Sequence, residues 1–148
     1  MFLHGGWFHV ISNMWVLFIF GDNVEARMGR TGYLIFYLLS GTAAGLLQTT
    51  VLPASQIPMI GASGAIAGVL GAYLVLFPRS RIASLVPIFF IFTLVEIPAF
   101  IFLLFWFVSQ LYSGLFMIQG GGASGIAWWA HVGGFLFGVI MASFFGRR

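Results

Sequence analysis

The chain contains no cysteine and no lysine, and only 6% of its 148 residues are charged. The absence of cysteine excludes disulfides, thiolate chemistry and cysteine-ligated metals. Soluble domains carry about 25% charged residues, whereas this chain is 61% hydrophobic with a mean hydropathy of +1.08. These values indicate an integral membrane protein whose first partner is the lipid bilayer. The six basic residues fall in scattered pairs, so the net charge of +3 predicts no nucleic-acid partner.

Apolar segments of membrane-spanning length dominate the rest of the sequence. A transmembrane helix needs about 20 mostly apolar residues. The sequence predicts five helices, at Trp7–Glu25, Thr31–Val51, Ser63–Phe77, Pro98–Met117 and Ile126–Phe145. The third is short for a full crossing, so we expect its first residue to lie below the membrane surface. The fold class is therefore an all-α, polytopic helical bundle, with residues 1–148 forming one transmembrane domain.

The arginines predict how this bundle lies in the membrane. They occur as Arg27/Arg30, Arg79/Arg81 and Arg147/Arg148, which follow the first, third and fifth helices. In a chain with five spans these three places share one side, and basic residues mark the cytoplasmic side. We therefore expect the N-terminus outside and the C-terminus inside.

One apolar stretch does not fit a span. Ile82–Val95 covers only about two-thirds of the required length, and Pro87 interrupts it. If it crossed the membrane, the last arginine pair would lie outside. We interpret it as an interfacial or re-entrant segment leading into the Pro98 helix, with Glu96 at the cytoplasmic interface.

The outer ends of three helices carry polar side chains, at His9, Ser63 and His131. Asn13 follows His9 by four residues, so both project from one helical face. A polar residue within a span suggests a functional site by default, because its burial costs several kcal/mol unless it is used or paired. The matching depth of these four side chains predicts a common site.

Ser63 and His131 are the candidate nucleophile and base. A hydroxyl is a weak nucleophile until a base within about 2.6–3.2 Å takes its proton, and His131 is the only plausible base at that depth. Gly61 and Gly64 permit a tight turn around the serine. The free N–H groups of a helix N-terminus favour a developing oxyanion.

Each of these residues also has a purely structural interpretation. Ser63 could be a helix N-cap, and His131 could be an interfacial histidine beside an aromatic belt. His9 and Asn13 could form interhelical hydrogen bonds worth about 0.6 kcal/mol each. If they instead donate to an oxyanion, the loss of one donor would cost roughly 10²–10³ in rate.

Glycine spacing favours direct packing of the third and fifth helices. Gly64 and Gly68 form a small-xxx-small face on the third helix, and Gly134 and Gly138 form one on the fifth. Contact between these faces would bring the serine and the histidine together.

Acidic residues are too few and too distant for a carboxylate-assisted site. Asp22, Glu25 and Glu96 are expected on the cytoplasmic side, away from His131. A Ser-His-Asp triad is therefore excluded by topology, and a hydrolase would use a Ser-His dyad. Three acids and three histidines are too few for a convincing haem or metal site, so no cofactor is predicted.

Four motifs follow one another along the chain: His4-Gly-Gly-Trp-Phe-His9 with Asn13, Glu25-Ala-Arg27-Met-Gly29, Gly61-Ala-Ser63-Gly64, and Ala130-His131-Val-Gly-Gly134-Phe-Leu-Phe-Gly138. Together they resemble the rhomboid family of intramembrane serine proteases over essentially the whole chain. The resemblance implies that Ser63 is the nucleophile and His131 the base. It also implies an oxyanion hole formed by the side chains of His9 and Asn13 with the Ser63 N–H.

The resemblance also assigns the surrounding segments. The Pro98–Met117 helix would be a lateral gate for substrate, and Gln119–Gly125 a flexible cap over a water-filled cavity. His4 is interpreted as a loop residue or a supporting hydrogen-bond donor, and Gly61 as a supporting residue. Substrates would be membrane-spanning proteins, cut near the outer part of their helix, in the plasma (inner) membrane if the source is prokaryotic.

Two departures from the family pattern are visible. The family core has six helices and five are predicted here, so the chain resembles a core without the helix that precedes His4. Several family members carry a tyrosine four residues after the nucleophile, where this chain has Ala67. Something else must then orient His131.

Two other functions would explain parts of this pattern. A catalytically inactive relative would bind membrane helices without cutting them, although it would have no reason to keep Ser63, His131, His9 and Asn13. A small transporter or channel would place its polar residues at mid-membrane depth, whereas these residues cluster near one face.

Overall fold

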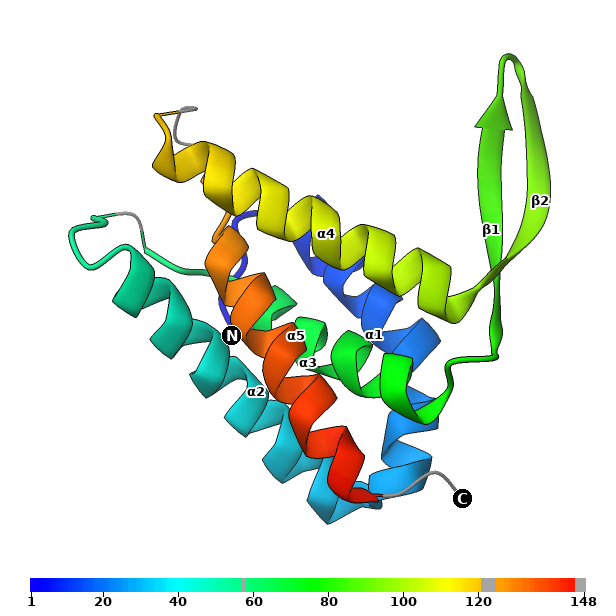
Figure 1. Cartoon of the computed structure of the whole chain (residues 1–148), viewed down its shortest axis with the longest axis horizontal. Coiled ribbons are helices and arrows are strands. Elements are labelled where there is room, and N and C mark those ends of the chain that lie inside the picture. The colour runs from blue at the N-terminus through cyan, green and yellow to red at the C-terminus, as the bar shows by residue number, and fades with distance from the viewer. Residues whose placement is uncertain (57, 121–124, 146–148) are drawn as a thin grey trace.

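A computed structural model describes residues 1–56, 58–120 and 125–145 (Figure 1). Its helices are α1 (Trp7–Met28), α2 (Arg30–Val51), α3 (Ser63–Leu76), α4 (Ala99–Ile118) and α5 (Trp128–Ala142), the last extended by the short 3₁₀ turn η1 (Ser143–Phe145). The five predicted helices are confirmed, and each begins and ends close to its predicted residues. The chain is a helical membrane bundle, as the sequence predicted.

Glycine separates the first two helices. α1 ends at Met28, and Gly29 follows with φ +74°, a conformation that side chains disfavour. The Gly29 N–H donates to the Glu25 carbonyl at 2.7 Å, which satisfies one of the open carbonyls at the helix end. The chain thereby turns directly into α2.

The helices differ in whether they are long enough to cross a membrane. Within the described residues, α2, α4 and α5 with η1 are long and apolar enough to cross a membrane. α3 is shorter, at 14 residues, and is buried along nearly its whole length. It lies at the centre of the bundle in contact with α1, α2, α4 and α5 (Figure 1).

The predicted glycine contact between α3 and α5 is confirmed. A Cβ on Gly134 would overlap the carbonyl oxygen of Gly64, and a Cβ on Gly138 would overlap that of Gly68. The two backbones therefore touch, with no side chain between them. This contact fixes the relative depth of the two helix N-termini, where Ser63 and His131 lie.

The segment Ile82–Val95 forms strands, which the sequence analysis did not predict. β1 (Arg81–Ile88) and β2 (Ile91–Pro98) pair antiparallel into a hairpin that projects from one end of the bundle (Figure 1). Glu96 is exposed and forms an ion pair with Arg81 at 3.6 Å. Glu96 therefore lies outside the helix core, and its place at the cytoplasmic interface stays a prediction.

The arginines of the described chain lie away from the candidate residues. Arg27 and Arg30 lie at the junction of α1 and α2, and Arg79 and Arg81 follow the end of α3. α3 begins at Ser63, so this arginine-bearing end is opposite to the serine. The third pair, residues 147 and 148, lies outside the described residues.

Candidate active site

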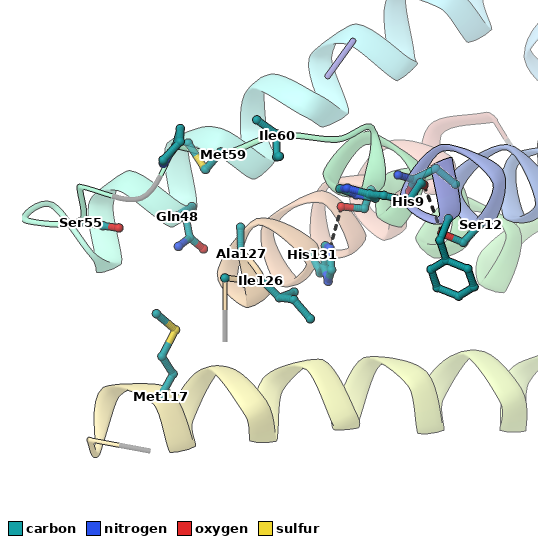
Figure 2. A pocket seen from close by; sticks show the side chains of 15 residues that line it. His9, Ser12, Gln48, Ser55, Met59, Ile60, Met117, Ile126, Ala127 and His131 are labelled. Carbon is teal, nitrogen blue, oxygen red and sulfur yellow. Dashed lines mark hydrogen bonds between the residues drawn. The ribbon is translucent and has the colours of Figure 1, made fainter. Parts of the chain in front are cut away.

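Ser63 and His131 are in hydrogen-bond contact. Ser63 is the first residue of α3, and His131 lies in the first turn of α5. The Ser63 Oγ and His131 Nε2 atoms are 2.8 Å apart (Figure 2). The N-cap interpretation of the serine is wrong, because the N-cap of α3 is Ala62 and no side chain caps the helix.

The second imidazole nitrogen has a partner that the sequence analysis missed. His131 Nδ1 lies 2.7 Å from Oε1 of Gln110, a buried residue of α4. The only available signal was a lone amide in the middle of an apolar span, which by default suggests a functional site. The ring of Trp106, one turn earlier on α4, lies 5.9 Å from the imidazole ring.

The two residues predicted for the oxyanion hole lie beside Gly61 on the loop before α3. Gly61 has φ +100°, and a Cβ there would lie 2.5 Å from His9 Nε2 and 3.6 Å from Asn13 Nδ2. The Gly5 N–H donates to His9 Nδ1 at 3.4 Å, so Nε2 is the protonated nitrogen in the neutral ring. Two donors therefore converge near the loop that precedes Ser63.

Asn13 is buried without a partner for its amide nitrogen. Among the described residues, none accepts a hydrogen bond from its Nδ2. A buried donor left unpaired costs about 1–3 kcal/mol. An unpaired group of this kind requires an explanation, and a ligand oxygen that arrives only during function provides one.

His4 lies in the loop before α1, as expected. Its Nε2 accepts from the Ala62 N–H at 3.4 Å. Its ring also packs edge-on against that of His9, with centroids 5.1 Å apart. The Gly61 N–H donates to the Leu3 carbonyl at 2.6 Å, so the segment before α1 is tied to the segment before α3.

His9, Asn13, Ser63 and His131 line one cavity of about 400 Å³ (Figure 2). Its lining includes His9, Ser12, Asn13, Gln48, Ser63, Met117, Ile126 and His131. Gln48 of α2 accepts from the Ala130 N–H at 3.1 Å, and the same N–H also donates to the Ala127 carbonyl at 3.0 Å. The expected cap, Gln119–Gly125, lies largely outside the described residues.

The site contains no candidate metal centre. Across residues 1–56, 58–120 and 125–145, no three histidine or acidic side chains gather closely enough to hold an ion. The arrangement combines a hydroxyl, an imidazole base and two further N–H donors at one end of the bundle. Those are the groups that acyl transfer to a serine requires.

A family model described as "Rhomboid domain" matches residues 1–148. The chain belongs to the rhomboid family. It is 42% identical over 67 residues to "Rhomboid-like protein 11, chloroplastic" of Arabidopsis thaliana, covering 45% of this chain and 24% of that protein. It is 36% identical over 72 residues to "Putative rhomboid protease YdcA" of Bacillus subtilis, covering 49% of this chain and 36% of that protein.

A further relative is "Rhomboid protein 1, mitochondrial" of Saccharomyces cerevisiae, 32% identical over 85 residues that cover 55% of this chain and 25% of that protein. The rhomboid chain thus spans between about a quarter and a third of the length of these curated relatives. No solved structure matches it.

Proposed function

We propose that this rhomboid domain is an intramembrane serine endopeptidase that cuts membrane-spanning segments of other proteins. The observation that carries the proposal is the 2.8 Å contact between Ser63 Oγ and His131 Nε2 in a cavity that also exposes His9 and Asn13. Family membership supports it, because the relatives include a protein named as a putative protease.

In the first half of the reaction, Ser63 Oγ attacks the scissile carbonyl carbon while His131 Nε2 takes the hydroxyl proton. The carbonyl oxygen becomes an oxyanion. It would accept hydrogen bonds from His9 Nε2, Asn13 Nδ2 and the Ser63 N–H at the start of α3. The imidazolium then gives its proton to the leaving amine, the C–N bond breaks, and an acyl-enzyme remains.

In the second half, water attacks the acyl carbon and His131 takes one of its protons. A second oxyanion forms at the same place, and its collapse releases Ser63 when the imidazolium returns the proton. No metal or cofactor is needed to balance either half.

A transmembrane protein would enter from the bilayer alongside α4, which the resemblance assigns as the lateral gate. Residues near its cleavage point must unwind, since a helix satisfies its own carbonyls and shields them from the serine. If the source is prokaryotic, the enzyme would act in the plasma membrane.

The direct test is labelling of the serine. The purified chain in detergent micelles is treated with a fluorophosphonate, and the modified residue is located by mass spectrometry. We expect the label on Ser63 and its loss in His131→Ala, because the hydroxyl needs the imidazole to react. Heat-denatured protein serves as the control. A folded chain that takes no label would contradict the proposal and favour the inactive helix-binding alternative.

The oxyanion assignment yields a second test. Asn13→Ala should lower kcat for a single-span reporter roughly 10²–10³-fold with little change in KM. Its thermal stability should fall less than the loss of a fully paired buried amide would cause, because the amide nitrogen that is removed has no partner among the described residues. Asn23→Ala, which changes an exposed asparagine on the same helix, is the matched control. An equal loss in both variants, or a loss that follows unfolding, would refute the role.

A further inference from the structure

We propose that Gln110 is a positioning residue that holds His131 in the tautomer needed by a serine nucleophile. The proposal rests on the proposed function, since it assigns a role within the same site. Gln110 belongs to α4, whereas the serine and the histidine belong to α3 and α5. α4 would thus contribute to catalysis by positioning the base.

The direction of the hydrogen bonds follows from the number of protons available. The Ser109 hydroxyl donates its single proton to the Trp106 carbonyl at 2.6 Å, because a carbonyl can only accept. The Ser109 oxygen therefore acts as an acceptor toward its neighbour. It receives a hydrogen bond from Gln110 Nε2 at 2.9 Å.

This arrangement fixes which end of the Gln110 amide faces the histidine. With Nε2 directed to Ser109, the carbonyl oxygen Oε1 faces His131 Nδ1 at 2.7 Å. An amide oxygen only accepts, so Nδ1 must carry the ring proton. Nε2 of the neutral ring is then left with its lone pair, directed at the Ser63 hydroxyl 2.8 Å away.

The chemistry matches the role that a carboxylate plays in a Ser-His-Asp triad, where the third group holds the imidazole in the correct tautomer. Gln110 is buried, with 7% of its surface exposed. A carboxylate there would carry a large desolvation cost, whereas a neutral amide with both ends bonded carries little. The absence of an acid near His131 therefore does not leave the ring without an orienting group.

Trp106 gives His131 a second contact with α4. It lies one turn before Gln110, so both side chains project from one face of the helix toward the same imidazole. Ala67, four residues after the serine, is fully buried and too small to stack on the ring. Displacement of α4 from α5 would break the hydrogen bond to Nδ1, so the base is held in place only while α4 is docked.

The test compares three changes on α4 in the full chain. Gln110→Leu removes the acceptor, Gln110→Glu keeps an acceptor oxygen, and Tyr112→Leu alters an exposed side chain of the same helix as the control. In a Ser-His-Asp triad, a change that forces the histidine into the wrong tautomer lowers kcat about 10⁴-fold. Leucine at position 110 would favour neither tautomer, so its effect should be smaller. We therefore expect Gln110→Leu to lower kcat roughly 10²-fold at unchanged KM. Gln110→Glu should keep more of the wild-type kcat than Gln110→Leu does, even though its buried carboxyl group lowers thermal stability.

A spectroscopic readout separates positioning from a structural role. The ¹⁵N shifts of the His131 ring should show the proton on Nδ1 in the wild type and a mixture of tautomers in Gln110→Leu. Ser109→Ala should give a mixture with a smaller share of the Nε2-protonated tautomer, because the Gln110 amide can then flip its oxygen and nitrogen. This readout does not depend on turnover, so it remains informative if a variant is too slow to assay.

The outcomes are distinguishable. Wild-type kcat and ring shifts in Gln110→Leu would overturn this inference and leave the Ser63–His131 chemistry intact. Losses that follow thermal stability in all variants, Tyr112→Leu included, would reduce Gln110 to a structural residue. A wild-type chain that neither cleaves a reporter nor labels at Ser63 would overturn the proposed function, and this inference with it.

Discussion

Replacement of Ser63 or His131 by alanine is expected to lower cleavage of a single-span reporter by roughly 10⁴–10⁶-fold. Each change removes one partner of the 2.8 Å contact. Without the hydroxyl no acyl-enzyme forms, and without the imidazole nothing takes the hydroxyl proton. Both proteins should remain in the membrane, because the helix packing does not depend on this hydrogen bond. The measurement is the initial rate of reporter cleavage in liposomes, at matched protein levels.

The double variant sharpens this prediction. Residues that act as a unit are strongly non-additive, so the double alanine variant should be no slower than the worse single variant. Ser143→Ala provides the control, since that hydroxyl bonds the Ile140 carbonyl at the far end of α5. Wild-type-like cleavage by Ser63→Ala would end the protease proposal, and additive losses would show that the two side chains act separately.

The part of this site that could be predicted is the part carried by local spacing. The GASG and AHVGG motifs place a serine and a histidine at the starts of two helices, and their glycines require those helices to touch. Depth in the membrane then follows from helix length alone. The same reasoning located His9 and Asn13, since four residues along a helix return to the same face.

Gln110 was not predicted because α4 gives no indication of which face points inward. The helix exposes large apolar side chains such as Phe105 and Val108 and buries Leu103, so hydrophobicity does not distinguish lipid from core. In a soluble protein the polar face would have marked the outside. Here only tertiary contact with α5 decides where the amide points.

The hairpin was missed for a different reason. A short apolar run cannot be assigned to helix or strand from periodicity alone, and Ile82–Val95 shows no alternation of polar and apolar residues. Pro87 argued against a helix, yet it lies within β1 opposite Phe92. The strands form because they pair with each other, and the sequence of one strand alone does not predict that pairing.

A large loss of stability is expected when a single methyl group is added at the contact between α3 and α5. Gly134→Ala should lower the free energy of unfolding by about 3 kcal/mol, the upper end of overpacking costs. The reason is that the new Cβ would meet the Gly64 carbonyl oxygen, which is backbone and cannot rotate away. Labelling of Ser63 should fall together with stability, because separating α3 from α5 also separates the serine from the histidine. Thermal unfolding in detergent and fluorophosphonate labelling measure the two effects.

Gly32→Ala is the matched control, because it makes the same chemical change within a helix. A Cβ there would meet only the Met28 Cβ, at 3.7 Å, so no atom has to move. Alanine is also favoured over glycine within a helix by about 1 kcal/mol, so this variant should unfold no earlier than the wild type. If Gly134→Ala were equally stable and equally reactive, α3 and α5 would not be in backbone contact.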